Sequence, residues 1–260
     1  MSRIFAAGDK TVLVDPRGRR YLITLKEGGE FHSHAGVLPH DDLIGQPEGV
    51  RGKATKGTIY VALRPTLIDF VLKMPRGAQV IYPKDLAPML MLADIFPGAR
   101  VLESGVGSGA LSMTMLRAGA VITGYELRDD FANRAKANVA EFLGGEALER
   151  YTVELRDAYD GLDTPAEPYD RVVLDLPEPW RVVPLLGDVI AAGGVMVAYT
   201  PQITQAVQVR QALERGPWID ASTIEVLHRG WHIEGQSVRP DHRMVGHTGF
   251  LTLARVGSEH

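Results

Sequence analysis

The apolar positions in the first part of the chain come in short runs rich in β-branched and aromatic residues. The turn sequence Asp15-Pro-Arg-Gly18 separates the first two runs, and the residues between 26 and 58 are dense in Gly and His without helical spacing. The expected strands are residues 11–14, 21–25 and 58–62. This pattern predicts a small β-rich N-terminal domain over residues 1–63.

Apolar residues first recur at helical spacing in Arg64–Met74, so residues 64–97 are expected to form a connecting helical segment. After Pro97-Gly98, short apolar runs alternate with amphipathic stretches. The expected strands are residues 99–103, 121–126, 151–155, 171–175 and 194–199, and the expected helices are residues 110–118, 129–143, 182–192 and 203–214.

This alternation predicts an α/β fold with a mostly parallel sheet and helices on both of its faces. Two further β-rich runs, residues 219–228 and 249–255, are expected to form an antiparallel pair at one edge. We therefore interpret residues 98–260 as one domain.

The composition narrows the class of protein. The 260 residues are 45% hydrophobic and include no cysteine, which excludes disulfides and thiolate metal sites and suits a cytoplasmic protein. No uncharged apolar run reaches the roughly 18–20 residues that a membrane-spanning helix needs, so we expect no membrane association.

The charge is unevenly distributed, although the net charge is only −4. Residues 1–84 hold 13 Lys and Arg against 8 Asp and Glu, whereas residues 85–260 hold 15 against 24. A phosphate backbone would be attracted to the first part of the chain and repelled by the second.

A glycine-rich loop follows the first expected strand of the larger domain. Glu103 ends that strand, Gly105, Gly107 and Gly109 follow at every second position, and a helix is expected next. Glycines allow a tight turn and a close approach to a ligand, and the helix amides face the same space. The spacing differs from the GxGxxG loop that binds a dinucleotide pyrophosphate. A carboxylate at Glu103 would repel a pyrophosphate but could attract the cationic end of S-adenosylmethionine.

Acidic residues also follow the next two strands. Glu126 stands where an acid can accept the ribose hydroxyls of a nucleotide, and Asp157 with Ala158 could meet an adenine amino group. Each acid alone is a common surface feature. Their shared position at strand ends indicates a cofactor with an adenosine end and favours S-adenosylmethionine over NAD.

Asp175 follows the fourth strand and precedes the proline-containing loop Leu176–Trp180. Methyl transfer to nitrogen requires alignment of a lone pair with the methyl carbon and stabilisation of the positive charge that develops, which a carboxylate can provide. We expect Asp175 to be catalytic, the alternative being a structural helix cap. Its loop departs from the Asp/Asn-Pro-Pro-aromatic motif of enzymes that methylate amino groups, and this departure favours a ring nitrogen.

Several separated segments together resemble the tRNA (adenine-58-N1)-methyltransferases, in which 58 numbers the tRNA nucleotide. The resemblance covers nearly the whole chain, and the Tyr-Pro-Lys-Asp and Gly-His-Thr segments are its most specific parts. The matching segments are residues 31–34, 64–67, 82–85, 101–111, 125–126, 174–180, 199–205 and 246–250.

The resemblance implies a homotetramer with a small N-terminal β domain and a Rossmann-like class I methyltransferase domain. The reaction would be methylation of adenine N1 in the T-loop of tRNA, with Asp175 holding the adenine through its amino group and Tyr82 lining the pocket. The cofactor site implied by the resemblance comprises Ser108, Gly109, Ala110, Leu111, Glu126, Phe131, Tyr159 and Asp175, to which the strand-end argument adds Glu103, Gly105, Gly107, Asp157 and Ala158.

Other residues are candidates for contacts with the RNA. Tyr82 or Trp180 could stack on a base that has flipped out of the folded tRNA, although both could equally be core residues. Arg19 and Arg20 lie at an expected hairpin and could contact phosphates. His247 is expected to border the active site. The histidines between residues 228 and 247 lack metal-ligand spacing on a helix, so no metal site is expected.

Two other classes of function are compatible with parts of this pattern. The first is a methyltransferase acting on another RNA, a small molecule or a protein, which the basic N-terminal part disfavours. The second is a non-catalytic tRNA-binding subunit, which would be expected to have lost the glycine loop or Asp175. An NAD-dependent dehydrogenase is disfavoured by the spacing of the glycine loop.

Overall fold

The computed structural model describes residues 4–77 and 79–257 and divides into two compact units, one ending at Met74 and the other beginning at Pro75. This division differs from the expected connecting segment 64–97, because its two helices belong to different units. The first helix, α1 (Leu67–Lys73), is tied to the first unit through Asp69, which forms a capping box with Thr66 and accepts a 2.6 Å bond from Arg20.

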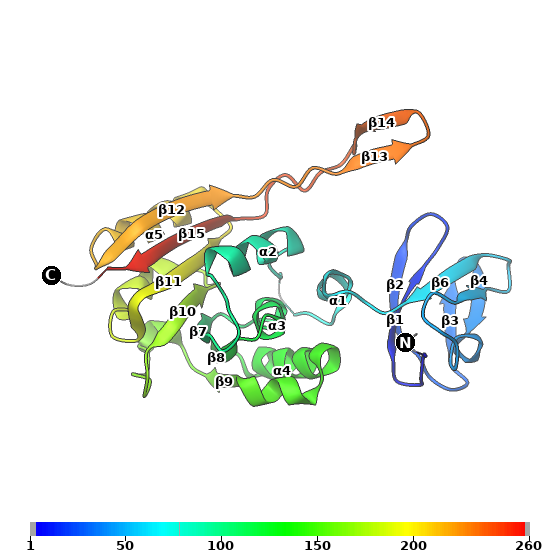
Figure 1. Ribbon diagram of the computed structural model, residues 1–260, viewed down its shortest axis with the longest axis horizontal. Helices are drawn as coiled ribbons and strands as arrows, with labels where there is room; N and C mark the ends of the chain where they lie inside the picture. Colours follow the sequence, from blue (N-terminus) through cyan, green and yellow to red (C-terminus); the bar gives the residue numbers. More distant parts are fainter. Residues whose placement is uncertain (1–3, 78, 258–260) are drawn as a thin grey trace. The chain divides into compact units, whose positions relative to one another are not determined.

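The first unit consists mainly of antiparallel strands, as its β-rich sequence predicts (Figure 1). Four strands form a sheet in the order β2-β1-β6-β5, and β3 and β4 form a separate hairpin. Their buried side chains, among them Leu13, Leu38 and Tyr60, form the core of this unit. The strands are β1 (Lys10–Val14), β2 (Arg20–Thr24), β3 (Glu30–Ser33), β4 (Gly36–Pro39), β5 (Arg51–Lys53) and β6 (Ile59–Leu63).

The second unit is built around a seven-stranded sheet in the order β12-β15-β11-β10-β7-β8-β9. The five strands from β11 to β9 are parallel, and β15 runs antiparallel between β11 and β12, which confirms the predicted fold class. The strands are β7 (Arg100–Ser104), β8 (Val121–Glu126), β9 (Tyr151–Leu155), β10 (Tyr169–Leu174), β11 (Ile190–Thr200), β12 (Trp218–Glu225) and β15 (Phe250–Val256).

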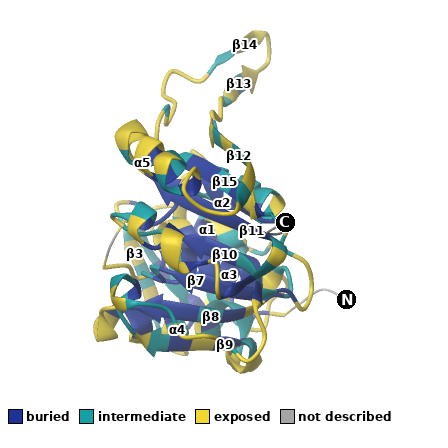
Figure 2. Ribbon diagram, turned by 90° about the vertical axis from the view of Figure 1, so that its left-hand side faces the viewer, coloured by how far each residue is buried: buried dark blue, intermediate teal, exposed yellow. Residues whose placement is uncertain are grey.

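The order in which strands are added to the sheet reverses between β7 and β10. Because crossover connections are right-handed, this reversal places the helices after β7 and β8 on one face of the sheet and the helix after β11 on the other. The central strands are buried between these layers (Figure 2). The helices of this unit are α2 (Pro83–Leu92), α3 (Ala110–Arg117), α4 (Asp129–Leu143) and α5 (Ile203–Leu213). Ligands bind to open sheets of this kind at the carboxyl ends of the strands, at the point of reversal.

The predicted helix over residues 182–192 is wrong. The structure has two short 3-10 turns there, Pro179–Arg181 and Val183–Leu185, and β11 already begins at Ile190. Gly187 and Asp188, which are poor helix formers, lie in the turn that leads into β11.

Two features were not predicted in this form, namely α2 as a helix separate from α1 and the hairpin of β13 and β14. Helix α2 begins directly after Tyr82 with Pro83 in its first turn, where a missing N–H costs nothing. Strands β13 (Trp231–Glu234) and β14 (Ser237–Pro240) form a hairpin that projects from the end of the sheet (Figure 1). Within residues 4–77 and 79–257, no helix is long and apolar enough to cross a membrane.

Candidate active site

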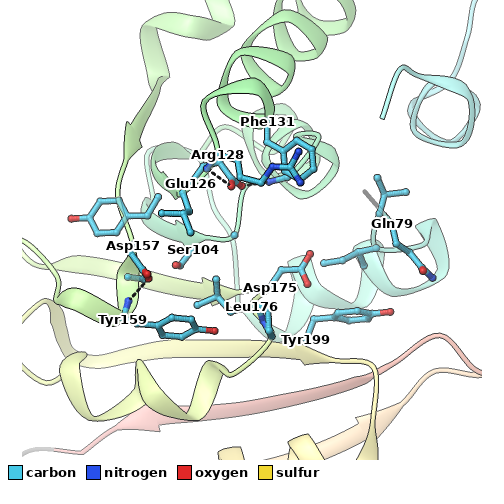
Figure 3. Close-up of a pocket in the computed structure, with 18 of the residues that line it drawn as sticks. Gln79, Ser104, Glu126, Arg128, Phe131, Asp157, Tyr159, Asp175, Leu176 and Tyr199 are labelled. Atoms are coloured by element: carbon cyan, nitrogen blue, oxygen red, sulfur yellow. Dashed lines mark hydrogen bonds between the residues drawn. The ribbon is translucent and has the colours of Figure 1, made fainter. Parts of the chain in front are cut away.

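A cavity of about 660 Å³ opens at the carboxyl ends of the parallel strands (Figure 3). Its size falls in the range of small-molecule and cofactor sites. Eight of the predicted site residues line it, namely Gly105, Gly107, Glu126, Phe131, Asp157, Ala158, Tyr159 and Asp175.

The glycine loop joins β7 to α3 and lies directly against the loop after β10. The backbone N–H of Asp175 donates to the Ser104 carbonyl (2.9 Å), and a Cβ atom at Gly105 would collide with the Asp175 carbonyl oxygen. Gly105 also has a φ of +88°, which other residues rarely adopt. At Gly107, by contrast, a Cβ would meet nothing within 4 Å. The backbone of the loop is therefore not covered by side chains where it faces the cavity, so a ligand can approach it closely.

Two of the predicted acids are fixed at the cavity by backbone N–H groups. Glu126, at the end of β8, accepts bonds from the amides of Gly107 (2.9 Å) and Arg128 (3.0 Å). Asp157, after β9, accepts one from the amide of Tyr159 (2.9 Å). Each carboxylate oxygen can accept more than one bond, so both acids keep acceptor capacity for ligand hydroxyl and amino groups.

The segment before α2 forms another wall of the cavity through Gln79, Val80 and Ile81 (Figure 3). The Phe131 ring also lines the cavity, and the Arg128 guanidinium lies 3.8 Å from the ring centroid. This wall combines apolar surface with a cation.

Asp175 extends into the cavity near Tyr199, the penultimate residue of β11 (Figure 3). Within the described part of the chain, no side-chain or backbone donor bonds to the Asp175 carboxyl group. Burial, and secondarily the charge of Glu126, raise the pKa of Asp175 to about 7. Asp175 is thus a carboxyl group whose hydrogen-bonding capacity is available to a ligand.

The sequence-based role of Glu103 does not match its position. Its side chain is 1% exposed and does not line the cavity, but accepts a 2.7 Å bond from Ser112, whose hydroxyl also bonds to Tyr151 (2.9 Å). Burial is the main cause that raises the pKa of Glu103 to about 8. The structure therefore places Glu103 beneath the loop, as an uncharged carboxyl group near neutral pH.

Other predicted residues also lie outside the residues that line the cavity. Gly109 and the first residues of α3 form the helical end of the loop, and Tyr82 occupies the N-cap position of α2 without a side-chain capping bond. Trp180 packs against the apolar core, which is the alternative expected for it from the sequence. The residues outside the lining are Glu103, Ser108, Gly109, Ala110, Leu111, Tyr82, Trp180, His247, Arg19 and Arg20.

The predicted RNA-binding side chains are engaged within the chain. Arg19 pairs with Asp15 (2.6 Å), Arg20 pairs with Asp69 (2.6 Å), and both ring nitrogens of His247 contact acceptors, Glu225 (2.6 Å) and the Pro201 carbonyl (2.8 Å). Two acceptors require two ring N–H groups, and the bond to Glu225 raises the pKa of His247 accordingly. His247 thus holds a loop beside the cavity.

Sequence reasoning missed several residues of the cavity wall, including Arg128, Tyr199, Pro201 and Thr248. The position of Tyr199 near the end of an apolar strand is the same signal that identified Asp175 and could have identified Tyr199 as well. Among the described residues, no group of three His, Asp or Glu is arranged to hold a metal ion.

Comparison with known proteins gives consistent matches. The family model described as "tRNA methyltransferase complex GCD14 subunit" matches residues 57–239, and the model "TrmI-like N-terminal" matches residues 4–50. The tRNA (adenine(58)-N(1))-methyltransferase TrmI of Thermus thermophilus is 36% identical over 247 residues, which cover 94% of this chain and 95% of the relative.

Two crystal structures share the fold over nearly their whole length. The tRNA (m1A58) methyltransferase TrmI of Aquifex aeolicus has a TM-score of 0.88 and 25% identity, covering 99% of this chain and 100% of the other. A protein of Thermotoga maritima described as a SAM-dependent O-methyltransferase has a TM-score of 0.92 and 28% identity, covering 98% and 96%.

Replacing Gly105 should test the contact between the two loops. We expect Gly105→Ala to lower the free energy of unfolding by ~2–4 kcal/mol, from backbone strain and overpacking combined. Gly98→Ala is the matched control, because Gly98 has a similar φ of +86° but nothing within 4 Å of a Cβ. Denaturant unfolding would measure both variants, and equal losses would exclude the collision.

The buried carboxyl group of Glu103 should make stability depend on pH. Its pKa in the folded protein, about 8, lies above the ordinary value of 4.5. Its contribution to the free energy of unfolding is therefore fully present below pH 4.5 and is lost as the pH rises through 8. We expect Glu103→Gln, which does not titrate, to gain ~1–3 kcal/mol relative to the unsubstituted protein between pH 5 and pH 8.5. Unfolding at several pH values, with the exposed Glu149→Gln as control, would measure the difference, and a difference that stays constant with pH would contradict the assignment.

Proposed function

The chain belongs to the family of tRNA (adenine-58-N1)-methyltransferases, and we propose that its methyl transfer takes place in the cavity beside Asp175. The enzyme is an S-adenosylmethionine-dependent methyltransferase that modifies N1 of adenine 58 in tRNA. The observation that carries the assignment of the site is the position of Asp175. Its carboxyl group is available to a ligand, and its backbone lies against the glycine loop at the point where the strand order reverses.

The residues of the cavity fit the adenosine part of S-adenosylmethionine. Gly107 leaves open space above the loop, Glu126 can accept the ribose hydroxyls, and Asp157 can accept the adenine amino group. Phe131 adds apolar surface on the same side. When bound, this cofactor supplies an electrophilic methyl group on a sulfonium, and the acidic strand ends favour its positive charge.

Asp175 would position the target base. Its carboxylate can accept a hydrogen bond from the exocyclic amino group of adenine, which directs the neighbouring N1 toward the cofactor. Adenine N1 is largely unprotonated at neutral pH, so no base is needed to free its lone pair. The ring becomes cationic after transfer, and a carboxylate in a partly dry cavity stabilises that charge.

Tyr199 replaces Tyr82 and Trp180 as the proposed aromatic partner of the base. Of these three rings, Tyr199 lines the cavity, on the side of Asp175 (Figure 3). Stacking on an aromatic ring offsets part of the cost of flipping a base out of folded RNA.

The alternatives fit the chain less well. A non-catalytic subunit would not need the open glycine loop and the available Asp175 carboxyl group, both of which this chain keeps. An O-methyltransferase, as the Thermotoga protein is described, needs a residue to remove the hydroxyl proton. The higher sequence identity to the Thermus enzyme, 36% against 28% for the Thermotoga protein, favours tRNA as the substrate.

The N-terminal unit is the proposed tRNA-binding surface, but the cations differ from those expected. Arg19 and Arg20 each share their charge with a carboxylate of the same chain. Arg17 is exposed, and no described residue pairs with its guanidinium group. We therefore assign the stronger phosphate contact to Arg17.

A homotetramer in the cytoplasm remains our proposal for the assembly. The projecting β13–β14 hairpin supports self-association, because Trp231, Ile233 and Val238 on one of its faces are 56%, 72% and 59% exposed. A two-stranded hairpin is marginally stable alone and gains stability when such a face is covered.

The proposed function is tested directly by treating unmodified tRNA with the purified protein and S-adenosylmethionine and mapping methylated nucleosides by mass spectrometry. We expect 1-methyladenosine at position 58. Methylation at an oxygen, or no tRNA methylation, would contradict the proposal.

The pH dependence of the reaction should depend on Asp175. With a pKa of about 7 in the free enzyme, the carboxylate is lost as the pH falls below 7, so kcat/KM for S-adenosylmethionine should fall in the same range. We expect Asp175→Asn to lower kcat by about 10²–10⁴-fold and to remove this acidic limb, while cofactor affinity falls much less. Single-turnover rates and calorimetric binding would measure these effects, and an unchanged acidic limb in Asp175→Asn would count against the assignment.

Salt dependence should distinguish the arginines. We expect Arg17→Ala to weaken tRNA binding and to reduce the slope of log K against log salt by about one. Arg215→Ala, a similarly exposed arginine in the acidic part of the chain, serves as control and should leave the slope unchanged. Equal slopes for Arg17→Ala and the unsubstituted protein would exclude a phosphate contact at Arg17.

A further inference from the structure

A buried ion pair lies next to the cavity but does not line it. The ammonium group of Lys84 and the carboxylate of Asp85 are 2.8 Å apart, and their side chains are 6% and 0% exposed. Both belong to the first turn of α2. Lys84 also donates to the carbonyl of Val226 (2.7 Å), and Asp85 accepts a 2.5 Å bond from the hydroxyl of Thr248.

These bonds join three segments that are distant in sequence. One is α2, the second is the residue that follows β12, and the third is the segment before β15 that contains Thr248. The segments meet where Thr248 lines the cavity. The ion pair therefore holds the cavity-lining residue Thr248 in place without lining the cavity itself.

The wall fixed in this way includes Tyr199. The Tyr199 hydroxyl donates to the Thr248 carbonyl (2.7 Å), and a Cβ at Gly249 would lie only 2.5 Å from the Tyr199 ring. The ring thus packs directly on the backbone of residues 248 and 249. A shift of this segment would move the ring relative to Asp175.

Stability alone does not explain a buried ion pair at this position. Removing two charges from water is costly, and apolar pairs of similar volume are often equally or more stabilising. Directional bonds, unlike apolar contacts, fix the relative positions of the three segments that the pair joins.

We propose that Asp85 is a positioning residue for the target base, which acts through Thr248 to hold Tyr199 at the distance from Asp175 that a flipped adenine requires. Lys84 completes the arrangement by compensating the buried charge and anchoring the end of β12. This inference rests on the proposed function, because it assumes that the base binds between Tyr199 and Asp175.

The first test removes the hydroxyl that connects Asp85 to the wall. Thr248→Val keeps the shape of the side chain without the donor, and Thr248→Ser keeps the donor without the methyl group. Thr252→Val is the matched control, because Thr252 lies in the following strand and its buried hydroxyl bonds to Thr223 (2.9 Å) away from the cavity. We expect Thr248→Val to lower kcat for tRNA methylation about tenfold or more, with KM for S-adenosylmethionine within about twofold of the unsubstituted protein. Thr248→Ser should recover most of the rate, and Thr252→Val should keep it.

The second test separates positioning from stability. Asp85→Asn leaves Lys84 unpaired, whereas the double substitution Lys84→Met with Asp85→Leu replaces the pair by apolar groups. We expect the double variant to have a melting temperature close to that of the unsubstituted protein while its kcat stays at least about tenfold reduced.

Several outcomes would overturn the inference. These are normal kcat in Thr248→Val, normal kcat in a folded double variant, or losses of cofactor affinity and melting temperature that match the loss of rate. A failure of the proposed function would appear separately, as the absence of 1-methyladenosine with the unsubstituted protein.

Discussion

The contact between the loops after β7 and β10 determines the geometry of the site. These strands are neighbours in the sheet, with Ser104 paired to Leu174, and the amide of Asp175 bonds to the Ser104 carbonyl. Because a side chain at Gly105 would collide with Asp175, the close approach requires glycine. The contact holds the proposed cofactor loop against Asp175, the proposed acceptor of the target base. The position of the base relative to the cofactor therefore depends on this one contact.

This geometry also concentrates carboxyl groups at one edge of the sheet. Glu103, Glu126 and Asp175 lie at the ends of three adjacent strands, and their mutual repulsion adds to the effect of burial on the pKa values of Glu103 and Asp175. Glu126 remains bonded to two backbone amides, whereas Glu103 is sealed beneath the loop. The acids therefore differ in role although their sequence positions look equivalent. We propose that Asp175 and Glu126 favour a cationic ligand in the cavity, whereas Glu103 bonds to Ser112 of α3.

The fold was predictable where local signals agreed. The alternation of strands and helices, the glycine loop and the antiparallel edge follow from periodicity and turn residues. The prediction failed over residues 182–192, where an apolar stretch resembles a helix but the chain turns at Gly187 and Asp188 and enters β11 at Ile190. It also expected one connecting helical segment over residues 64–97, where the structure has two helices, α1 and α2, that belong to different units.

The two halves of the site differ in how far sequence could identify them. The half proposed to bind adenosine consists of residues at or just after strand ends, such as Glu126 and Asp157, so a rule about strand ends finds them. The base half depends on bonds between residues far apart in the chain, such as Asp85 with Thr248, which only tertiary structure reveals. Tyr82 stands between Ile81, which lines the cavity, and the supporting pair Lys84 and Asp85, although its own ring does not line the cavity. Tyr199 also begins one of the segments that match the family, but the match alone did not show that its ring lines the cavity.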